Sequence, residues 1–394
     1  MKALAILHTA LNTSLGLDYQ TSAASARAGL VRSQEADNYP ISKPAMDEVE
    51  SAIIHPLPFI TAAFQDQARL AVILKKTLSD LCEQLNRDNV NIPLDIYVSL
   101  PHPHRTNQGL ALQTDEPSAQ ESELEALLDS EEPDESLYSA TINPCLNALP
   151  WPVAPNLKNV FFSGSTGVSE CINAVTASIA DENENSSKAE QGVLSIIVGV
   201  DSLVSIKELK WLHSCNRLKH ADNPVGVQPG EAGAAFTVCT TKVANKLGLK
   251  SQGFIQQCIN ESSPTSQLKA QISDGKVLAT ILDRVLPVID EDTVYQAWII
   301  SDHNGEDTRA AEWGGALHFL KKHKPNIQVR DTWYPVISFG YTEAAYGAIA
   351  MVLICEAFRR GYAPNSYACV MASADNFLRS GMTVTLENVG QNHV

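Results

Sequence analysis

Short runs of consecutive apolar residues alternate along the chain with longer segments in which apolar residues recur every three or four positions. The first pattern is typical of buried β-strands and the second of amphipathic α-helices, so the sequence predicts an α/β fold. The predicted strands are Ala3–His8, Leu94–Leu100, Val160–Ser163, Val193–Val200, Ala234–Thr240, Ala297–Ile300, Tyr367–Ala372 and Met382–Leu386. The predicted helices are Thr21–Leu30, Ile60–Leu85, Thr166–Ile179, Val204–His213, Leu268–Leu286, Arg309–Lys322 and Thr342–Arg360.

Two polar segments interrupt this alternation, Thr114–Ala140 and Asp181–Gln191, and both are predicted to be exposed loops. A change of composition near Lys242–Gly253 indicates a join between two halves, residues 1–245 and residues 246–394. Each half contains several predicted strands and helices, so an internal two-fold repeat is one interpretation. The two halves share no clear sequence similarity, and the repeat is a hypothesis that the pattern alone leaves open.

Charge is concentrated in the first of these polar segments. The formal net charge is −16, from 29 Lys and Arg against 45 Asp and Glu. Ten of the acidic residues lie in 114–140 without any basic residue, so the rest of the chain carries −6. Nucleic acids and anionic membrane surfaces select basic faces, and we therefore expect neither as a main partner. No segment is long and apolar enough to span a bilayer.

The eight cysteines are scattered and form no C-x-x-C pair. This usage is typical of reduced, buried thiols, and it predicts a cytoplasmic protein. The apolar run Met1–His8 is too short for a signal peptide and is interpreted as a first strand.

Four segments of the chain, taken in order, resemble the β-ketoacyl synthase (3-oxoacyl-ACP synthase) family of the thiolase superfamily. They are Leu11–Arg32 with Leu15-Gly16-Leu17, Ser163–Gly167 running into Cys171–Ala174, Ile196–Ser202 followed by Gly230–Ala235, and Ser338–Ala348. Each segment alone is a weak signal, but together they cover nearly the whole chain. The resemblance implies a thiolase-like fold of two pseudo-repeated αβαβα halves, with mixed sheets in a layered arrangement.

The chemistry of that family requires four side chains. A cysteine at a helix N-terminus accepts the acyl group, two histidines stabilise the charge that develops during condensation, and a lysine orders the second histidine. Matched position by position, the cysteine falls on Gly164, the second histidine on Tyr341 and the lysine on Val336. The first histidine falls on His303 if the alignment contains a gap, whereas an ungapped match places Ser301 there.

These departures from the family pattern predict a ketosynthase fold without ketosynthase chemistry. Glycine has no side chain to acylate, and a tyrosine cannot act as an imidazole does near neutral pH. The family's glycine-rich oxyanion segment is also lost, because it appears here as Ala372–Asn376. Catalytic groups that act as a unit are not replaced singly, so we interpret the site as degenerate.

Ser165 is the fallback nucleophile, and His303 is the base that the resemblance brings near it. The simpler interpretation is that Ser165 or Thr166 caps the helix that follows. Cys171 lies about two turns inside that helix and is interpreted as a core residue. Asp201 follows a buried strand and is expected to have a structural role.

No cofactor or metal site is predicted. His102-Pro103-His104 lacks further ligands at metal-binding spacing and is interpreted as a surface loop. The carboxylate-rich stretch of Asp302, Glu306, Asp307 and Glu312 includes Arg309 and is expected to be a salt-bridged loop.

Several functions fit this pattern. The first is a protein that acts by binding, as a chain-length-factor-type subunit paired with an active ketosynthase or as a homodimeric adaptor, and acyl carrier protein is a candidate partner. The resemblance implies pairing through the strand around Asn159–Phe162. Degenerate ketosynthase-like proteins are also similar to accessory proteins of bacterial type VI secretion systems. The alternative is an active 3-oxoacyl-ACP synthase or acyltransferase of fatty acid or polyketide type with a rearranged site.

Overall fold

The computed structural model describes residues 2–43, 48–102, 135–184, 192–266, 271–288 and 293–389. The strands of the large sheet are β1 (Leu4–Thr13), β4 (Leu94–Ser99), β5 (Asn156–Phe161), β6 (Leu194–Ser202), β7 (Glu231–Thr240), β8 (Gly253–Ser262), β9 (Tyr295–Ser301), β10 (Ile327–Trp333), β11 (Tyr367–Ser373) and β12 (Leu378–Thr385). A separate hairpin consists of β2 (Gln34–Lys43) and β3 (Glu48–Ile54).

The helices fall into the long ones that cover the sheet and several short ones. The long helices are α1 (Tyr19–Arg27), α3 (Asp66–Arg87), α6 (Glu135–Asn147), α7 (Gly167–Glu184), α8 (Ile206–Ser214), α10 (Lys276–Val285), α11 (Asp307–His323) and α13 (Tyr346–Arg360). The short ones are α2 (Pro58–Thr61), α9 (Thr241–Leu247), α12 (Val336–Phe339) and the 3₁₀ turns η1 (Gly164–Thr166) and η3 (Glu343–Ala345).

The large sheet contains the same topology twice. Its order is β10-β9-β11-β12-β8-β1-β7-β6-β4-β5. From β1 outward, the strands of the first half follow the chain order first, fifth, fourth, second, third, and the strands from β8 outward follow the same order. The two antiparallel and two parallel pairings also recur in the same sequence. The predicted pseudo-repeat is therefore confirmed, although the two halves join edge to edge through a short antiparallel pairing of β1 with β8.

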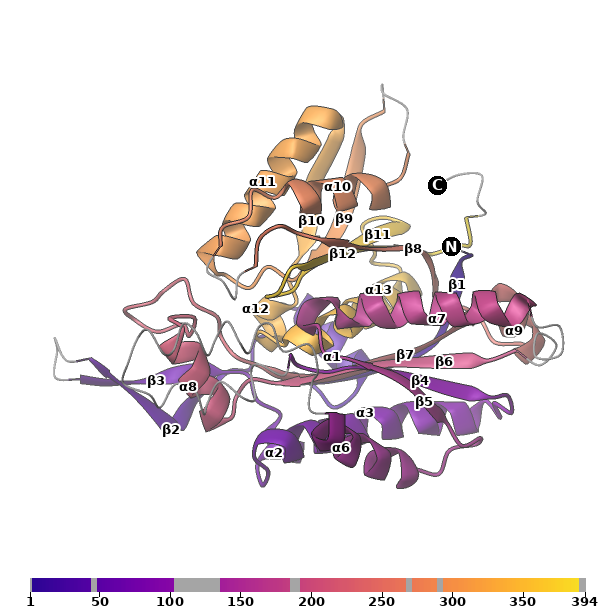
Figure 1. Ribbon diagram of the computed structural model, residues 1–394, viewed down its shortest axis with the longest axis horizontal. Coiled ribbons are helices and arrows are strands. Elements are labelled where there is room, and N and C mark those ends of the chain that lie inside the picture. The colour runs from indigo at the N-terminus through magenta and orange to yellow at the C-terminus, as the bar shows by residue number, and fades with distance from the viewer. Residues whose placement is uncertain are drawn as a thin grey trace.

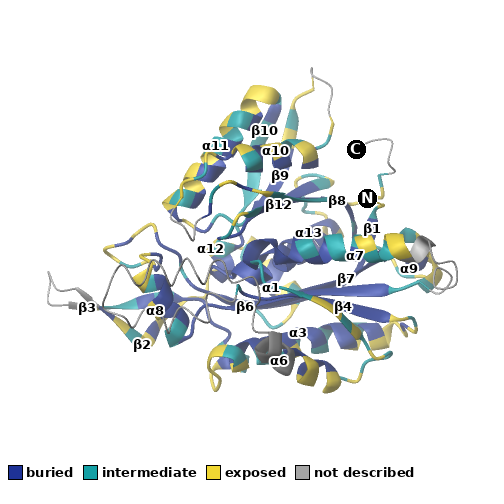
Figure 2. Cartoon of the chain, in the orientation of Figure 1, coloured by how far each residue is buried: buried dark blue, intermediate teal, exposed yellow. Residues whose placement is uncertain are grey.

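Figure 1 shows the predicted layered arrangement, with helices and the two halves of the sheet in alternating layers. Helices α7 and α13 lie between the two halves of the sheet, α3 and α6 cover the outer face of the first half, and α10 and α11 cover that of the second. The layers explain the burial in Figure 2: every residue of α13 from Tyr346 to Phe358 is buried, because this helix has a sheet on both sides. It ends as the sequence indicates, with Arg359 and Arg360 in its last turn and Gly361 in the left-handed conformation.

A smaller unit projects from these layers, and we call it the side lobe. It consists of β2, β3, α8 and residues 215–229, and it lies at the left of Figure 1. It has an apolar cluster of its own, in which Ile41, Ile54 and Leu209 pack with Trp211 and Leu218.

Several sequence predictions need correction. The helix predicted for Ile60–Leu85 is two helices, α2 and α3, and Asp66 has a left-handed backbone (φ 44°) at the start of the second. The predicted loop 114–140 is wrong at its end, because α6 begins at Glu135, and residues 114–134 lie outside the described residues. The prediction of a loop at residues 181–191 is also wrong for residues 181–184, because α7 continues to Glu184.

The strands β2, β3, β8 and β10 are absent from the sequence prediction. All four carry polar residues on half-exposed faces and so lack the continuous apolar run of a buried strand. The helix predicted for Leu268–Leu286 is confirmed only over Lys276–Val285.

All eight cysteines are free, and six of them are buried. Within the described residues there is no cluster of three or more His, Cys, Asp or Glu side chains arranged to hold a metal ion. No helix in this part of the chain is long and apolar enough to cross a membrane.

Candidate functional site

The turn after β5 is the position that the family resemblance assigns to the nucleophile. Gly164 opens this turn, η1, and α7 follows directly. Its φ of 54° lies in the left-handed region, where side chains are strained. A Cβ on Gly164 would lie 2.1 Å from Oε1 of Glu343 and 2.6 Å from its Cδ. The space next to the nucleophile position is therefore filled by a carboxylate from the other half of the molecule.

Glu343 itself is buried and firmly placed. It opens η3, the turn before α13. The backbone N–H and carbonyl of the next residue, Ala344, are both hydrogen-bonded. The N–H of Ala344 donates to Oδ2 of Asp201 at 2.7 Å, and its carbonyl accepts from Oγ of Ser99 at 3.0 Å. Asp201 also accepts from the N–H of Ser202 at 2.7 Å, so its predicted structural role is confirmed.

The strand beneath η3 must carry a glycine for this arrangement to form. A Cβ on Gly199 of β6 would lie 2.7 Å from the carbonyl oxygen of Ala344 and 3.2 Å from the Cα of Ala345. The close approach of η3 to β6 therefore depends on the missing side chain.

Ser165 is buried beside Gly164, but its hydroxyl has no hydrogen-bond partner in the part of the chain that the structure describes. The prediction that Ser165 caps α7 is therefore wrong. Thr166 donates its hydroxyl to the carbonyl of Ser163 at 3.0 Å instead of accepting from the helix. Cys171 lies in the core, where burial raises the pKa of its thiol well above the ordinary value, as expected for an inert thiol.

Tyr341 and Val336, at the family's histidine and lysine positions, pack against the side lobe. Tyr341 is buried in the apolar cluster of the lobe, and Val336 packs against the same cluster. The phenol hydroxyl of Tyr341 has no hydrogen-bond partner among the described residues. Burial, followed by the nearby carboxylates of Asp375 and Glu343, raises the pKa of Tyr341 well above its usual range. Both side chains thus form contacts that hold the lobe, and neither is placed to carry a proton near neutral pH.

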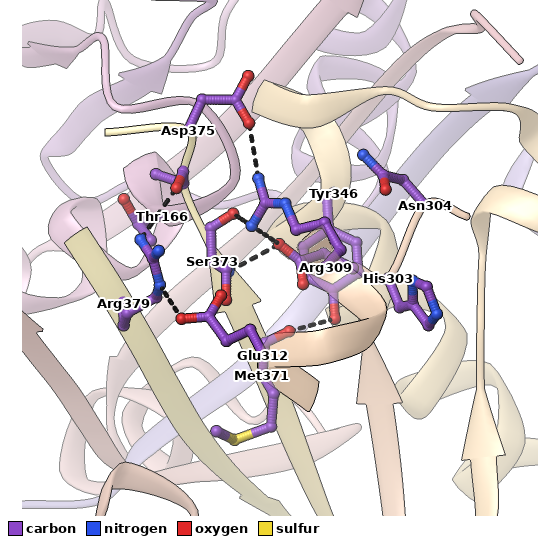
Figure 3. A network of polar contacts seen from close by, with 12 residues as sticks. Thr166, His303, Asn304, Arg309, Glu312, Tyr346, Met371, Ser373, Asp375 and Arg379 are labelled. Carbon is purple, nitrogen blue, oxygen red and sulfur yellow. Dashed lines mark hydrogen bonds and ion pairs between the residues drawn. The ribbon is translucent and has the colours of Figure 1, made fainter. Parts of the chain in front are cut away.

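His303 lies on the loop after β9, at the edge of the site. Its ring is half-buried and meets the ring of Tyr334 edge-on, with centroids 5.9 Å apart. Figure 3 shows the ring pointing away from the side chains of Arg309 and Asp375. Burial lowers the pKa of His303, and the Arg309 guanidinium lowers it further. Ser301, the alternative for this position, is buried and accepts from the backbone N–H of His303 at 3.2 Å.

A buried network of charges, which we call the ion network, surrounds the β11–β12 turn, and Figure 3 shows its members Arg309, Glu312, Asp375 and Arg379. It contains three guanidinium groups and four carboxylates, all buried or nearly so: Arg217, Arg309, Arg379, Asp302, Glu306, Glu312 and Asp375. Asp375 is held by Arg217 at 2.5 Å and by Arg309 at 2.7 Å. Arg379 pairs with Glu312 at 2.7 Å.

The ion network confirms that the stretch 302–312 is salt-bridged, but the stretch is a loop only up to Glu306, because α11 begins at Asp307. Arg217 comes from the side lobe, and Asp375 and Arg379 come from the β11–β12 turn and β12. No sequence signal connects these residues, which are about 70 to 160 positions apart. Buried charges that lack a partner are costly, so these groups are tolerated only because the fold brings them together.

A second buried ion pair, between Arg69 and Glu231, holds the segment around α2, which follows strand β3 of the lobe. Glu231 is fully buried and accepts from Nε of Arg69 at 2.6 Å and from Nη2 at 3.0 Å. It also accepts from the N–H of Leu57, the hydroxyl of Thr61 and the hydroxyl of Ser202. Five donors therefore satisfy one carboxylate, which is the condition under which a buried charge is tolerated.

Comparison with known proteins places the fold. No family model matches the sequence, and no curated protein matches it. Among solved structures, the ishigamide ketosynthase/chain length factor is similar, with a TM-score of 0.64, 12% identity, and coverage of 98% of this chain and 99% of that one. A β-ketoacyl synthase from Burkholderia phymatum has a TM-score of 0.63, 15% identity, and coverage of 98% and 100%.

A third similar structure is the complex of a type II polyketide synthase acyl-carrier protein with its ketosynthase bound to the hexaketide. Its TM-score is 0.67 at 10% identity, with coverage of 98% of this chain and 99% of that one. Identities this low establish the fold alone. The described chain has the thiolase-type fold of the ketosynthases, as the sequence resemblance predicted.

Proposed function

We propose, from this ketosynthase fold, that the protein acts by binding, as a chain-length-factor-type or adaptor subunit, and does not transfer acyl groups. The observation that carries the proposal is the contact between Gly164 and Glu343. The position of the acylated side chain has no side chain, and a carboxylate fills the adjacent space. A nucleophile at this position could not reach a substrate without displacing Glu343.

Electrostatics support the same conclusion. A thiolate at the start of α7 would be stabilised by the positive end of the helix. In this chain the carboxyl group of Glu343 lies next to the turn at that end and takes the place of such a side chain. The residues at the other three family positions support the same conclusion. Tyr341 and Val336 pack in the lobe, and the ring of His303 points away from the side chains of Arg309 and Asp375.

The proposed partner is a second copy of this chain or an active ketosynthase, with acyl carrier protein as a further candidate. Among the described residues β5 is an outer strand of the large sheet; Lys158 and Asn159 on it are exposed, whereas Leu157 and Val160 pack partly against the core. An unpaired edge of this kind is suited to pairing with another chain. The chain length factor and the carrier-protein complex among the similar structures support this choice of partners.

An acyl-transfer assay tests the proposal directly. Purified protein is incubated with acyl and malonyl thioesters of acyl carrier protein, and covalent acylation is followed by intact-protein mass spectrometry. We expect no condensation product and no acyl adduct on the wild type. We also expect no adduct on Gly164→Cys, because Glu343 occupies the space in front of the new thiol. Turnover by the wild type that disappears in Ser165→Ala would contradict the proposal and identify Ser165 as the nucleophile.

The identity of the partner needs a second experiment. The tagged protein is purified from its native cell at low salt, and the recovered proteins are quantified by mass spectrometry. Stoichiometric recovery of a ketosynthase with an intact cysteine supports the chain-length-factor role, and recovery of the protein alone supports a homodimeric adaptor. Recovery of secretion-system components in the same amount would replace both with the type VI accessory role.

A further inference from the structure

The side lobe and the β11–β12 turn are distant in the sequence but share one side chain. Arg217 belongs to the lobe through its backbone: its N–H donates to the carbonyl of Leu212 at 2.7 Å, and its carbonyl accepts from Val227 at 2.7 Å. Its guanidinium leaves the lobe after passing the ring of Trp211, with Cζ 5.4 Å from the ring centroid. Arg217 therefore links the backbone of the lobe to the residues that its guanidinium contacts.

That side chain ends in the second half of the molecule. Nε and Nη2 of Arg217 form a two-pronged contact with both oxygens of Glu306, at 2.7 and 2.9 Å. Nη1 reaches Oδ2 of Asp375 at 2.5 Å. Glu306 precedes α11, and Asp375 lies at the tip of the β11–β12 turn, so a single guanidinium bridges three elements.

The β11–β12 turn is held by charge at several points along its length. Arg309 donates to the second carboxylate oxygen of Asp375 at 2.7 Å and to the carbonyl of Ser373. The N–H of Ser373 donates to Asp302 at 2.7 Å. Nη1 of Arg379 donates to the carbonyls of residues 374, 376 and 378, at 3.0, 2.9 and 2.9 Å. These guanidinium groups hold the turn together with Ser263 and Ser266, whose N–H and hydroxyl donate to the carbonyls of residues 377 and 375 at 2.6 and 2.9 Å.

Burial makes the arrangement cooperative. Arg217 and Arg309 hold the pKa of Asp375 well below its usual range, and Arg217 lowers the pKa of Glu306, in both cases against the effect of burial. A buried charge that loses its partner pays the full cost of desolvation, so removing one member weakens the attachment of the others. Displacing Arg217 leaves two carboxylates facing each other with only Arg309 to compensate them.

We propose that Arg217 couples the position of the side lobe to the conformation of the β11–β12 turn. β11 and β12 pack against η1, the turn that contains Gly164, so a change in this turn reaches the centre of the site. A partner that shifts the lobe would loosen the turn, and a ligand that opens the turn would free the lobe. This coupling does not depend on whether the site catalyses a reaction.

Hydrogen exchange followed by mass spectrometry tests the coupling on the full-length protein. Exchange is compared between the wild type, Arg217→Gln and Asp375→Asn, with Arg284→Gln as the control because Arg284 and Glu261 form an exposed ion pair at 2.6 Å. We expect both network variants to raise exchange on the order of tenfold in residues 373–380 and also in the lobe strands β2 and β3. The control should change neither region.

Two outcomes would overturn the coupling. Arg217→Gln could raise exchange in the lobe alone, or Asp375→Asn could raise it in the turn alone, and either would show that the two regions open independently. If these variants fail to fold, Arg217→Lys keeps the charge but removes the two-pronged contact with Glu306. We expect it to raise exchange in both regions by a smaller factor, and protection equal to the wild type in both would again contradict the proposal.

Discussion

Gly164 and Glu343 hold equivalent positions in the two halves of the molecule, and they meet. Each opens a 3₁₀ turn that follows the third strand of its half and leads into the helix of the central layer, α7 or α13. The Cβ that Gly164 lacks would lie 2.1 Å from the Glu343 carboxylate. The first half has a glycine at this position, and the equivalent residue of the second half, Glu343, fills the space that a side chain would occupy.

The first prediction concerns this contact. Gly164→Ala should lower the free energy of unfolding by about 2–3 kcal/mol, because the new methyl group both collides with Glu343 and occupies a left-handed backbone. In a Glu343→Gly background the same substitution should cost about 1 kcal/mol, since only the backbone strain remains. Urea denaturation of the four proteins measures the difference.

Gly29 is a matched control for this cycle. It also has a left-handed backbone, with φ 72°, but a Cβ there would meet nothing within 4 Å. Gly29→Ala should therefore cost about 1 kcal/mol in both backgrounds. Equal costs for Gly164→Ala with and without Glu343 would show that the two residues do not compete for space.

The second prediction concerns the hydroxyl of Tyr341. It is buried and no described residue offers it a hydrogen bond, so its burial contributes a desolvation cost. Tyr341→Phe should leave the free energy of unfolding unchanged or raise it by about 1 kcal/mol. Tyr341→Ala is the contrasting variant, because it empties part of the lobe cluster and should cost about 3–5 kcal/mol. A loss of more than about 1 kcal/mol for the phenylalanine variant would reveal a hydrogen bond at this hydroxyl.

The third prediction concerns pH. Burial raises the pKa of Asp302 to about 6, although Arg309 opposes the shift. The folded protein therefore holds this proton more tightly than the unfolded chain, so the contribution of Asp302 to stability is largest at low pH and is lost as the pH rises through about 6. Asp302→Asn cannot lose a proton. Relative to the wild type it should gain on the order of 1 kcal/mol between pH 5 and pH 7.5.

Denaturation of both proteins across that range measures the gain. The asparagine keeps an oxygen to accept from Ser373, so the backbone contact is retained. A stability difference that stays constant with pH would show that Asp302 ionises at an ordinary pKa.

The fourth prediction concerns the buried pair of Arg69 and Glu231. Arg69→Met removes the cation and leaves Glu231 as an uncompensated buried charge, so it should cost about 3–5 kcal/mol. Arg284→Met, at an exposed pair of similar length, should cost less than about 1 kcal/mol. Urea denaturation at neutral pH compares the two, and similar costs would mean that water screens the Arg69 pair.

The fifth prediction concerns assembly. If another copy pairs along β5, Asn159→Asp should shift the protein towards monomer in sedimentation experiments, because Asn159 is exposed on that strand and two copies would bury carboxylates near one another. Thr332→Asp on β10, the other outer strand, is the control. Dissociation by Thr332→Asp with no effect of Asn159→Asp would place the interface on β10 instead.

The sequence predicted the strands and helices that are buried on all sides. β6 and α13 lie inside the layers, so their apolar runs are continuous and their boundaries lie close to the predicted ones. It missed β8 and β10, because an alternating or half-exposed strand carries polar residues that resemble a loop. The assignment of Gly164, His303, Val336 and Tyr341 to the family's catalytic positions stays a prediction from the resemblance, because it rests on short local motifs.

By itself the sequence determined that the chain has an α/β fold, that it resembles the ketosynthases, and that Gly164 cannot be acylated. It could not show that Glu343 fills the adjacent space, or that Arg217 of the lobe compensates Asp375. Those facts were decided by the tertiary structure, which brings the two half-repeats and the lobe together. Backbone patterns depend on neighbours in the sequence, whereas the contacts between buried charges depend on residues that only folding makes adjacent.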